Sequence, residues 1–201
     1  LLFFFCFTSR ILFLKLQYSG TKRVFNRFNS MRLGFLKDIE SRVSVTPITL
    51  KKYIDANHSV CVEKNAGEVS GFSDKSYNHD KILSRKDVIK SSDILVLVNS
   101  SSIESYNDLK GKTIISNFSV EPDRELIKQN IKKNKITAFD LSMIPRTTIA
   151  QSMDILSSMA GLSGYKAVIK AAELLPKIFP MTITAAGSIK PVKVVVLGAG
   201  V

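Results

Sequence analysis

The stretch DILVLV, residues 93–98, decides the fold class of this 201-residue chain. Residues 94–98 are apolar without a break, and the polar side chains of Asp93 and Asn99 bound them. An apolar run of this length is typical of a strand that is covered on both faces, as in a parallel sheet. Other short apolar or β-branched runs predict further strands at residues 31–36, 59–63, 113–115 and 136–139.

Helical segments separate these predicted strands. Thr46-Pro47 predicts a helix that continues to about Ala56, because proline is tolerated in a first helical turn. Residues 121–134 predict another helix, with acidic residues first and lysines later, as the helix dipole prefers. Weaker signals are a turn at residues 65–67 and a helix start at residues 74–77. Strands that alternate with short helices predict an α/β domain with a mostly parallel sheet covered on both faces.

The segment PRTTIAQSMDILSSMA, residues 145–160, carries the most specific polar content. Thr147 or Thr148 is expected to cap a helix that begins there. Helical spacing would place Ile149, Met153, Leu156 and Met159-Ala160 on one apolar stripe.

Polar side chains of that segment would share another face of the same helix. Gln151, Asp154 and Ser158 lie at i, i+3 and i+7, with Ser157 beside them and Arg146 just ahead of the first turn. The positive end of a helix dipole favours polar or anionic ligand groups at such a start. An ordinary surface helix is the alternative interpretation.

The rest of the chain predicts a long helix, a hairpin and a final strand. The helix would continue to about Leu175, with a break or close contact at Gly161 and Gly164, and Pro176 would end it. Residues 181–189 predict a hairpin with Gly187 at its turn. Residues 192–197, VKVVVL, predict a buried strand that leads into Gly198-Ala199-Gly200-Val201, the opening of a dinucleotide-binding fingerprint.

Three stretches resemble the NAD(H)-binding domain of the alpha subunit of proton-translocating NAD(P) transhydrogenases: residues 145–172, TITAAG at 182–187 and KPVKVVVLGAGV at 190–201. The similarity covers residues 31–201 and is close from Pro145 onward. It implies that hydride passes from NADH to NADP⁺, with NADP(H) held on a separate domain, and that the transfer is coupled to proton translocation. It further implies that Arg146, Gln151 and Asp154 are catalytic, and that the NAD(H)-binding residues are Arg146, Gln151, Asp154, Ser157, Gly198, Gly200 and Val201.

The first half resembles the first of two Rossmann-like domains that alanine dehydrogenases share with these alpha subunits, in MRLGF (31–35), RVSVTP (42–47) and residues 62–77. Alanine dehydrogenases carry a lysine and a histidine after two successive strands, to hold and protonate the keto acid. The corresponding stretches here, residues 94–102 and 114–120, contain neither residue. This difference favours transhydrogenase, because direct hydride transfer needs no general acid. An alanine dehydrogenase-like fragment and a non-catalytic product that binds a partner subunit are the alternatives.

Four regions follow from these assignments. Residues 1–30 are expected to be a targeting segment, and residues 31–145 form the Rossmann-like domain. Residues 146–190 hold the nicotinamide-site loop, the connecting helix and the hairpin, and residues 191–201 open a truncated second Rossmann domain. The resemblance implies that the NADP(H)-binding and membrane domains are partners, that the hairpin contributes to a homodimer, and that this fragment is inactive alone.

Residues 1–30 are apolar and basic, contain no acidic residue, and hold no apolar run of the ~18–20 residues that a membrane helix needs. Such a segment is typical of secretory and organellar targeting, with a translated upstream region or a disordered tail as the alternative. The resemblance implies the mitochondrial inner membrane, and another organelle is the second choice.

Composition argues against a nucleic-acid or metal-binding protein. The formal charge is +12, and five of those charges lie in residues 1–30, which leaves 12 − 5 = +7 spread as isolated cations. No aromatic residues are interleaved with them, so a solvated lysine-rich surface is the better interpretation. Cys6 and Cys61 have neither the CxxC nor the Cys/His spacing of a zinc site, and His58 and His79 are expected to be structural.

Overall fold

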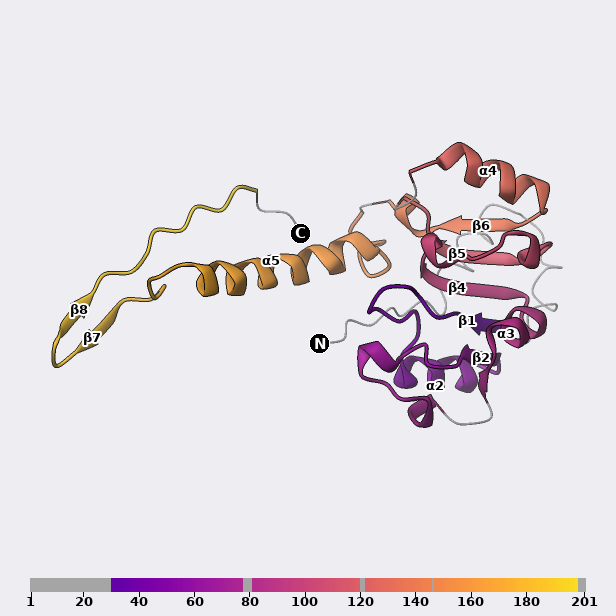
Figure 1. Ribbon diagram of the computed structural model, residues 1–201, viewed down its shortest axis with the longest axis horizontal. Helices are drawn as coiled ribbons and strands as arrows, with labels where there is room; N and C mark the ends of the chain where they lie inside the picture. The colour runs from indigo at the N-terminus through magenta and orange to yellow at the C-terminus, as the bar shows by residue number, and fades with distance from the viewer. Residues whose placement is uncertain (1–29, 78–80, 120–121, 146, 199–201) are drawn as a thin grey trace. The chain divides into compact units, whose positions relative to one another are not determined.

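The computed structural model describes residues 30–77, 81–119, 122–145 and 147–198 (Figure 1). They divide into two compact units, with the boundary between Met153 and Asp154. The predicted targeting segment, residues 1–30, lies outside the described residues except for Ser30.

The first unit is built on one parallel six-stranded sheet in the order β3-β2-β1-β4-β5-β6. All five strand pairs are parallel, and the arrows in Figure 1 point the same way. The mostly parallel α/β fold predicted from the sequence is therefore confirmed. The strands are β1 (Arg32–Phe35), β2 (Ser59–Glu63), β3 (Ile82–Leu83), β4 (Ile94–Asn99), β5 (Thr113–Asn117) and β6 (Thr137–Asp140).

Three α-helices of this unit begin at side-chain caps. They are α2 (Pro47–Asp55), α3 (Arg85–Ser91) and α4 (Arg124–Lys133), and the cap side chains belong to Thr46, Ser84 and Asp123. Each cap oxygen accepts a backbone N–H three residues later, which satisfies a donor that the helix cannot. Short 3₁₀ turns lie at Glu68–Ser70, Asp74–Tyr77, Ser100–Ser102, Asn107–Leu109 and Leu141–Met143.

Helices cover both faces of the sheet. On one face Val88 of α3 and Ile127 of α4 pack with the buried side chains of β4 and β5. On the other face Leu50 of α2 packs with those of β1 and β2. Gly34 lets β1 approach α3, since a Cβ there would lie 2.3 Å from the Ser92 hydroxyl oxygen. The near-continuous apolar run of β4 is explained by this burial on two sides.

Three features of this unit differ from the sequence prediction. The helix expected over residues 121–134 begins at Arg124, because Asp123 caps it. Helix α3 and strand β3 were not predicted; α3 has seven residues and β3 two, which is too short for a clear apolar period.

The second unit contains α5 (Ile155–Leu174) and a hairpin of β7 (Thr182–Thr184) and β8 (Gly187–Ile189). The prediction that this helix starts near Thr148 is wrong: its cap is Asp154, whose side chain accepts from the amide of Leu156. The expected break at Gly161 and Gly164 is also wrong, since α5 is continuous there. A Cβ at either glycine would meet no atom within 4 Å.

The hairpin prediction is confirmed, with Ala185-Ala186 between the strands. Gly187 opens β8 with φ +129°, a backbone conformation that only glycine adopts easily. The predicted strand at residues 192–197 is absent: the segment pairs with no described strand. Val195 and Leu197 are 81% and 94% exposed. The segment has the apolar composition of a strand, but a β-strand also requires hydrogen bonds to a neighbouring strand. No helix among the described residues is long and apolar enough to cross a membrane.

Candidate functional site

The carboxyl edge of the six-stranded sheet is the first candidate site. From β1 the chain continues to β2 on one side of the sheet, and from β4 it continues to β5 on the other side. The adjacent strands β1 and β4 therefore form the topological switch point of the sheet. In open α/β sheets, ligands bind in the crevice outside the carboxyl ends of the strands at such a point.

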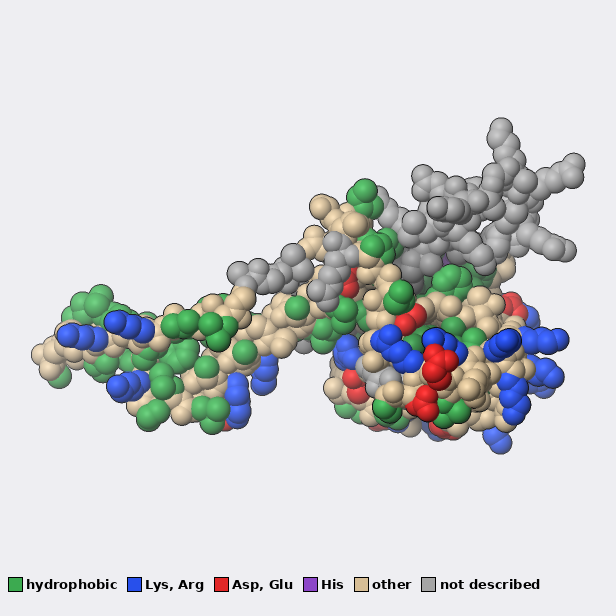
Figure 2. Space-filling model, turned by 90° about the horizontal axis from the view of Figure 1, so that it is seen from above, with side chains coloured by type: hydrophobic (Ala, Val, Ile, Leu, Met, Phe, Trp, Pro, Cys, Tyr) green, Lys and Arg blue, Asp and Glu red, His purple; other side chains and the backbone are tan. Residues whose placement is uncertain are grey.

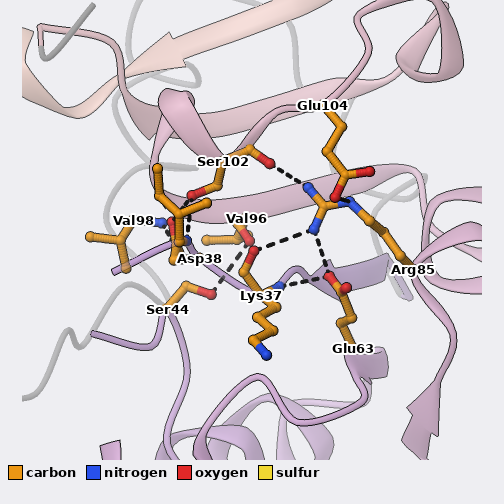
Figure 3. Close-up of polar contacts among 10 residues, drawn as sticks. Lys37, Asp38, Ser44, Glu63, Arg85, Val96, Val98, Ser102 and Glu104 are labelled. Carbon is orange, nitrogen blue, oxygen red and sulfur yellow. Dashed lines mark hydrogen bonds and ion pairs between the residues drawn. The ribbon is translucent and has the colours of Figure 1, made fainter. Parts of the chain in front are cut away.

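Asp38, three residues after β1, occupies this switch point in the structure (Figure 3). Its carboxylate accepts hydrogen bonds from the amides of Val98 and Asn99, each at 3.0 Å, and from the Ser102 hydroxyl at 2.9 Å. The residue is 5% exposed. Burial raises the pKa of Asp38 above its ordinary value, although these three hydrogen bonds oppose the shift. The Asp38 carboxylate therefore already accepts the hydrogen bonds of the Val98 and Asn99 amides at the end of β4. An anionic ligand at this edge would need the same donors.

Arg85, the first residue of α3, ties the neighbouring loops together (Figure 3). Its guanidinium donates to Glu63 at 3.0 Å, to the carbonyl of Lys37 at 3.3 Å and to the carbonyl of Ser102, and it pairs with Glu104 at 3.3 Å. The side chains of Arg85 and Glu63 are only 18% and 13% exposed. The segments after β1 and β4 and the last residue of β2 are thus held by one planar cation, which presents several donors at once.

Asparagine side chains end the next two strands. Asn117, the last residue of β5, donates its side-chain N–H to Asn99, the last residue of β4, at 3.3 Å. Asn117 also accepts from the amide and hydroxyl of Ser119. At the end of β6, Asp140 accepts from the amide of Phe118 at 3.1 Å. Side chains at the strand ends thus hydrogen-bond to the neighbouring strand end or loop along this edge, which holds it in one arrangement.

The second candidate site is the constellation predicted in residues 145–160. Asp154 is buried at the start of α5: one carboxylate oxygen accepts from Leu156 N at 2.9 Å and the other from the Ser157 hydroxyl at 2.5 Å. The structure therefore brings Asp154 and Ser157 together, as predicted. Ser158 lies one turn on and donates its hydroxyl to the Asp154 carbonyl at 3.4 Å.

Gln151 does not share the helical face that its spacing predicted. It lies in a turn at residues 147–153, where Thr147 accepts the amides of Ala150 and Gln151, and its side chain is exposed. The apolar stripe is wrong for the same reason: Ile149 is 76% exposed whereas Met153 is 6% exposed. A capped turn at residues 147–153 and the separately capped helix α5 replace one continuous helix, so the period of 3.6 residues does not run across both.

The remaining predicted site residues lie in or beside residues outside the described ranges. Arg146, Gly200 and Val201 are not among the described residues. Gly198 is described and has φ +92°, with no atom within 4 Å of an added Cβ, which fits the tight turn predicted for it. Within the described ranges, no group of three or more His, Cys, Asp or Glu side chains is placed to hold a metal ion.

Sequence reasoning missed the network of Asp38, Arg85, Asn99 and Asn117. A usable signal exists for three of them, because Asp38 follows a predicted strand and each asparagine ends or follows one. Polar residues just past buried strands gather at one edge of a parallel sheet. Arg85 gave no such signal, because the helix that carries it was not predicted.

Comparison with known families and proteins gives consistent matches. The family described as "Alanine dehydrogenase/PNT, N-terminal domain" matches residues 36–163, and "Alanine dehydrogenase/PNT, C-terminal domain" matches residues 167–201. The NAD(P) transhydrogenase subunit alpha of Haemophilus influenzae is 38% identical over 168 residues, which cover 83% of this chain and 33% of the relative. Alanine dehydrogenase 1 of Staphylococcus aureus is 30% identical over 139 residues, or 68% of this chain and 36% of the relative.

Solved structures agree with the sequence matches. A transhydrogenase from Sinorhizobium meliloti superposes with a TM-score of 0.72 at 30% identity, over 80% of this chain and 49% of that one. An L-alanine dehydrogenase gives 0.62 at 25% identity, over 71% and 40%. The chain spans less than half the length of these relatives.

Proposed function

Because this chain belongs to the alanine dehydrogenase/PNT family, we propose that it supplies one portion of the NAD(H)-binding side of an NAD(P) transhydrogenase. In the assembled enzyme, hydride passes from NADH to NADP⁺ held on a separate domain, and the transfer is coupled to proton translocation across a membrane. The NADP(H)-binding and membrane domains are the partners, and the hairpin of β7 and β8 contributes to a homodimer. The mitochondrial inner membrane is the proposed location, reached through residues 1–30.

The Asp154–Ser157 pair at the start of α5 is the observation that carries this proposal. The 2.5 Å hydrogen bond orients the Ser157 hydroxyl, and the Leu156 amide orients the carboxylate. A carboxylate is a strong acceptor for a carboxamide N–H, and a hydroxyl can donate to or accept from the same amide group. The geometry supports a pair that holds the carboxamide of a nicotinamide ring.

Each predicted residue then has a positioning role. Arg146 donates hydrogen bonds at the nicotinamide end of NAD(H), Asp154 accepts from the carboxamide, and Ser157 helps to fix it. Gln151, exposed in the turn before α5, reaches toward the second nicotinamide. NAD(H), when bound, supplies the hydride carrier. The protein's task is positioning, since hydride transfer requires the reacting carbons within about 3–3.5 Å of each other.

The segment after the hairpin is proposed to hold the dinucleotide backbone. Gly198 makes the tight turn, and its φ of +92° supports this role. Gly200 lets backbone approach the pyrophosphate, and Val201 follows in the same loop. Only glycine at these two positions leaves the backbone accessible to phosphate oxygens.

Amino-acid oxidation is the less favoured function. The sheet's carboxyl edge presents the hydrogen-bonded pair of Asn99 and Asn117 at the ends of β4 and β5. Residues 94–102 and 114–120 contain no lysine to pair with a substrate carboxylate and no histidine to protonate an imine. Neutral amides do neither at neutral pH, so these two stretches supply no acid–base group for that chemistry.

Nucleotide titration of the complete NAD(H)-binding protein tests the proposal. We expect NADH to bind more tightly than NADPH, as measured by quenching of nicotinamide fluorescence or by calorimetry. Equal affinity, or a preference for NADPH, would refute the assignment. A test for alanine-dependent NAD⁺ reduction in the same preparation separates the two functions, because the transhydrogenase assignment requires that none occurs.

A further inference from the structure

Lysines gather at the amino edge of the six-stranded sheet, opposite the candidate site. Figure 2 shows Lys and Arg side chains collected at the end of the first unit where the strands begin. We define the lysine edge as the exposed residues Lys90, Lys110, Lys132, Lys133 and Lys135.

Backbone hydrogen bonds explain why residues from three segments meet there. The amide of Gly111 donates to the carbonyl of Asn134 at 3.0 Å. Lys110 flanks the first of these residues, and Lys133 and Lys135 flank the second, so one hydrogen bond brings three cations together. Lys112 links the end of α3 to them, because its ammonium donates to the carbonyl of Ser92 at 2.5 Å.

The five lysines form no ion pair among the described residues. Nearby Asp93 is engaged by Arg32 at 2.5 Å, and the paired Lys128 and Glu125 lie toward the other end of α4. The negative end of the α4 dipole accounts for Lys132 and Lys133. It does not account for Lys110 and Lys135, which lie in loops between elements.

The chemistry of the lysine edge narrows the kind of partner. Protein interfaces are depleted in lysine and anchored by aromatic residues and arginine, and single-stranded nucleic acid needs aromatic stacking platforms. The exposed large hydrophobic residues of this unit do not belong to this edge. The five residues of the lysine edge carry flexible ammonium groups, with no aromatic or arginine anchor among them, and suit a diffuse anionic surface that is recognised by charge alone.

We propose that the lysine edge is a docking surface for an anionic lipid bilayer, which it contacts electrostatically without insertion. This inference goes beyond the proposed function and does not depend on it. The attraction weakens as salt rises, since the Debye length is about 10 Å at 0.1 M ionic strength.

Vesicle co-sedimentation of the full chain tests this proposal, with phosphatidylcholine vesicles that contain or lack phosphatidylglycerol. The lysine-edge variant is K110Q/K132Q/K133Q/K135Q. The matched control is K51Q/K64Q/K75Q/K86Q, which removes the same charge from exposed positions elsewhere in the first unit. Both keep residues 1–30, so the cations there contribute equally.

We expect the wild type to bind only the anionic vesicles, and the lysine-edge variant to lose about fivefold in partitioning for each lysine removed. The control variant should bind within about threefold of the wild type, and circular dichroism should show both variants folded. Equal losses in the two variants, binding to neutral vesicles, or no vesicle binding would overturn the proposal. Binding of the wild type to DNA but not to vesicles would overturn it in favour of a nucleic-acid partner.

Discussion

Replacing Asp38 with alanine should destabilise the first unit by about 2–4 kcal/mol. The substitution removes the acceptor of three hydrogen bonds and leaves the amides of Val98 and Asn99 without their partner. Each buried donor left unsatisfied costs about 1–3 kcal/mol. The Ser102 hydroxyl can rotate toward another acceptor, and removal of a buried charge gives back some of the loss.

Urea unfolding of the full chain, followed by circular dichroism at neutral pH, measures this effect. The midpoint should fall while the slope with denaturant stays constant, because the surface exposed on unfolding hardly changes. Asp123→Ala is the control: that exposed aspartate caps α4 through one hydrogen bond, and its loss should cost about 1 kcal/mol.

The isosteric variant Asp38→Asn separates charge from hydrogen bonding. The side-chain oxygen of the variant can still accept from the amide of Asn99. Its NH₂ group would face the amide of Val98, so two hydrogen-bond donors would meet with no acceptor between them. An intermediate loss is therefore expected. If Asp38→Ala proves no more harmful than Asp123→Ala, Asp38 does not hold the switch point together, and the account of the carboxyl edge fails.

Three further predictions follow from named atoms. The pKa of Asp38 is raised, so the folded protein keeps the carboxyl proton of Asp38 to a higher pH than the unfolded chain does. The contribution of this proton binding to the free energy of unfolding is complete below the ordinary pKa of 3.8 and is lost as the pH rises through the pKa of the folded state. Unfolding free energies of wild type and Asp38→Asn, measured against pH, should therefore diverge in that window, and parallel curves would contradict the assignment. Ser116→Ala should stabilise the protein by about 1 kcal/mol, because the Ser116 hydroxyl is the buried side-chain oxygen without a partner among the described residues; a loss in melting temperature would count against this. Gln151→Asn in the intact enzyme should lower the transhydrogenation rate far more than NADH affinity, since the proposed contact forms only in the reacting pair; lost NADH affinity with normal turnover at saturation would show a simple NADH ligand instead.

Local patterns in the sequence predicted most of the sheet. The strand expected at residues 59–63 is β2 with the same bounds, and the helix expected from Thr46-Pro47 is α2 with Thr46 as its cap. Both depend on neighbouring residues alone: alternation for the strand, a hydroxyl and a proline for the helix start. Such signals are complete within about ten residues, so a single sequence contains them.

The network at the carboxyl edge could not be predicted in the same way. Asp38 and Asn99 are separated by 61 positions, and Arg85 and Lys37 by 48. Their contacts exist only because β1 and β4 are adjacent, with Gly34 opposite Leu95. Strand order and register depend on the packing of the whole sheet, which no local pattern contains.

The misplaced start of α5 shows a competition between two caps. Thr147 does accept the amide of Ala150, at 3.4 Å, and so begins a helical turn as its hydroxyl predicts. The Asp154 carboxylate accepts the amide of Leu156 at 2.9 Å, and Asp154 has φ −76° and ψ 111°, an extended conformation that a continuous helix would not allow. The carboxylate is the stronger cap because it is charged and faces the positive end of the dipole. The helical period that would have placed Gln151 and Asp154 on a single face therefore does not run through Asp154, because the backbone leaves helical geometry at that residue.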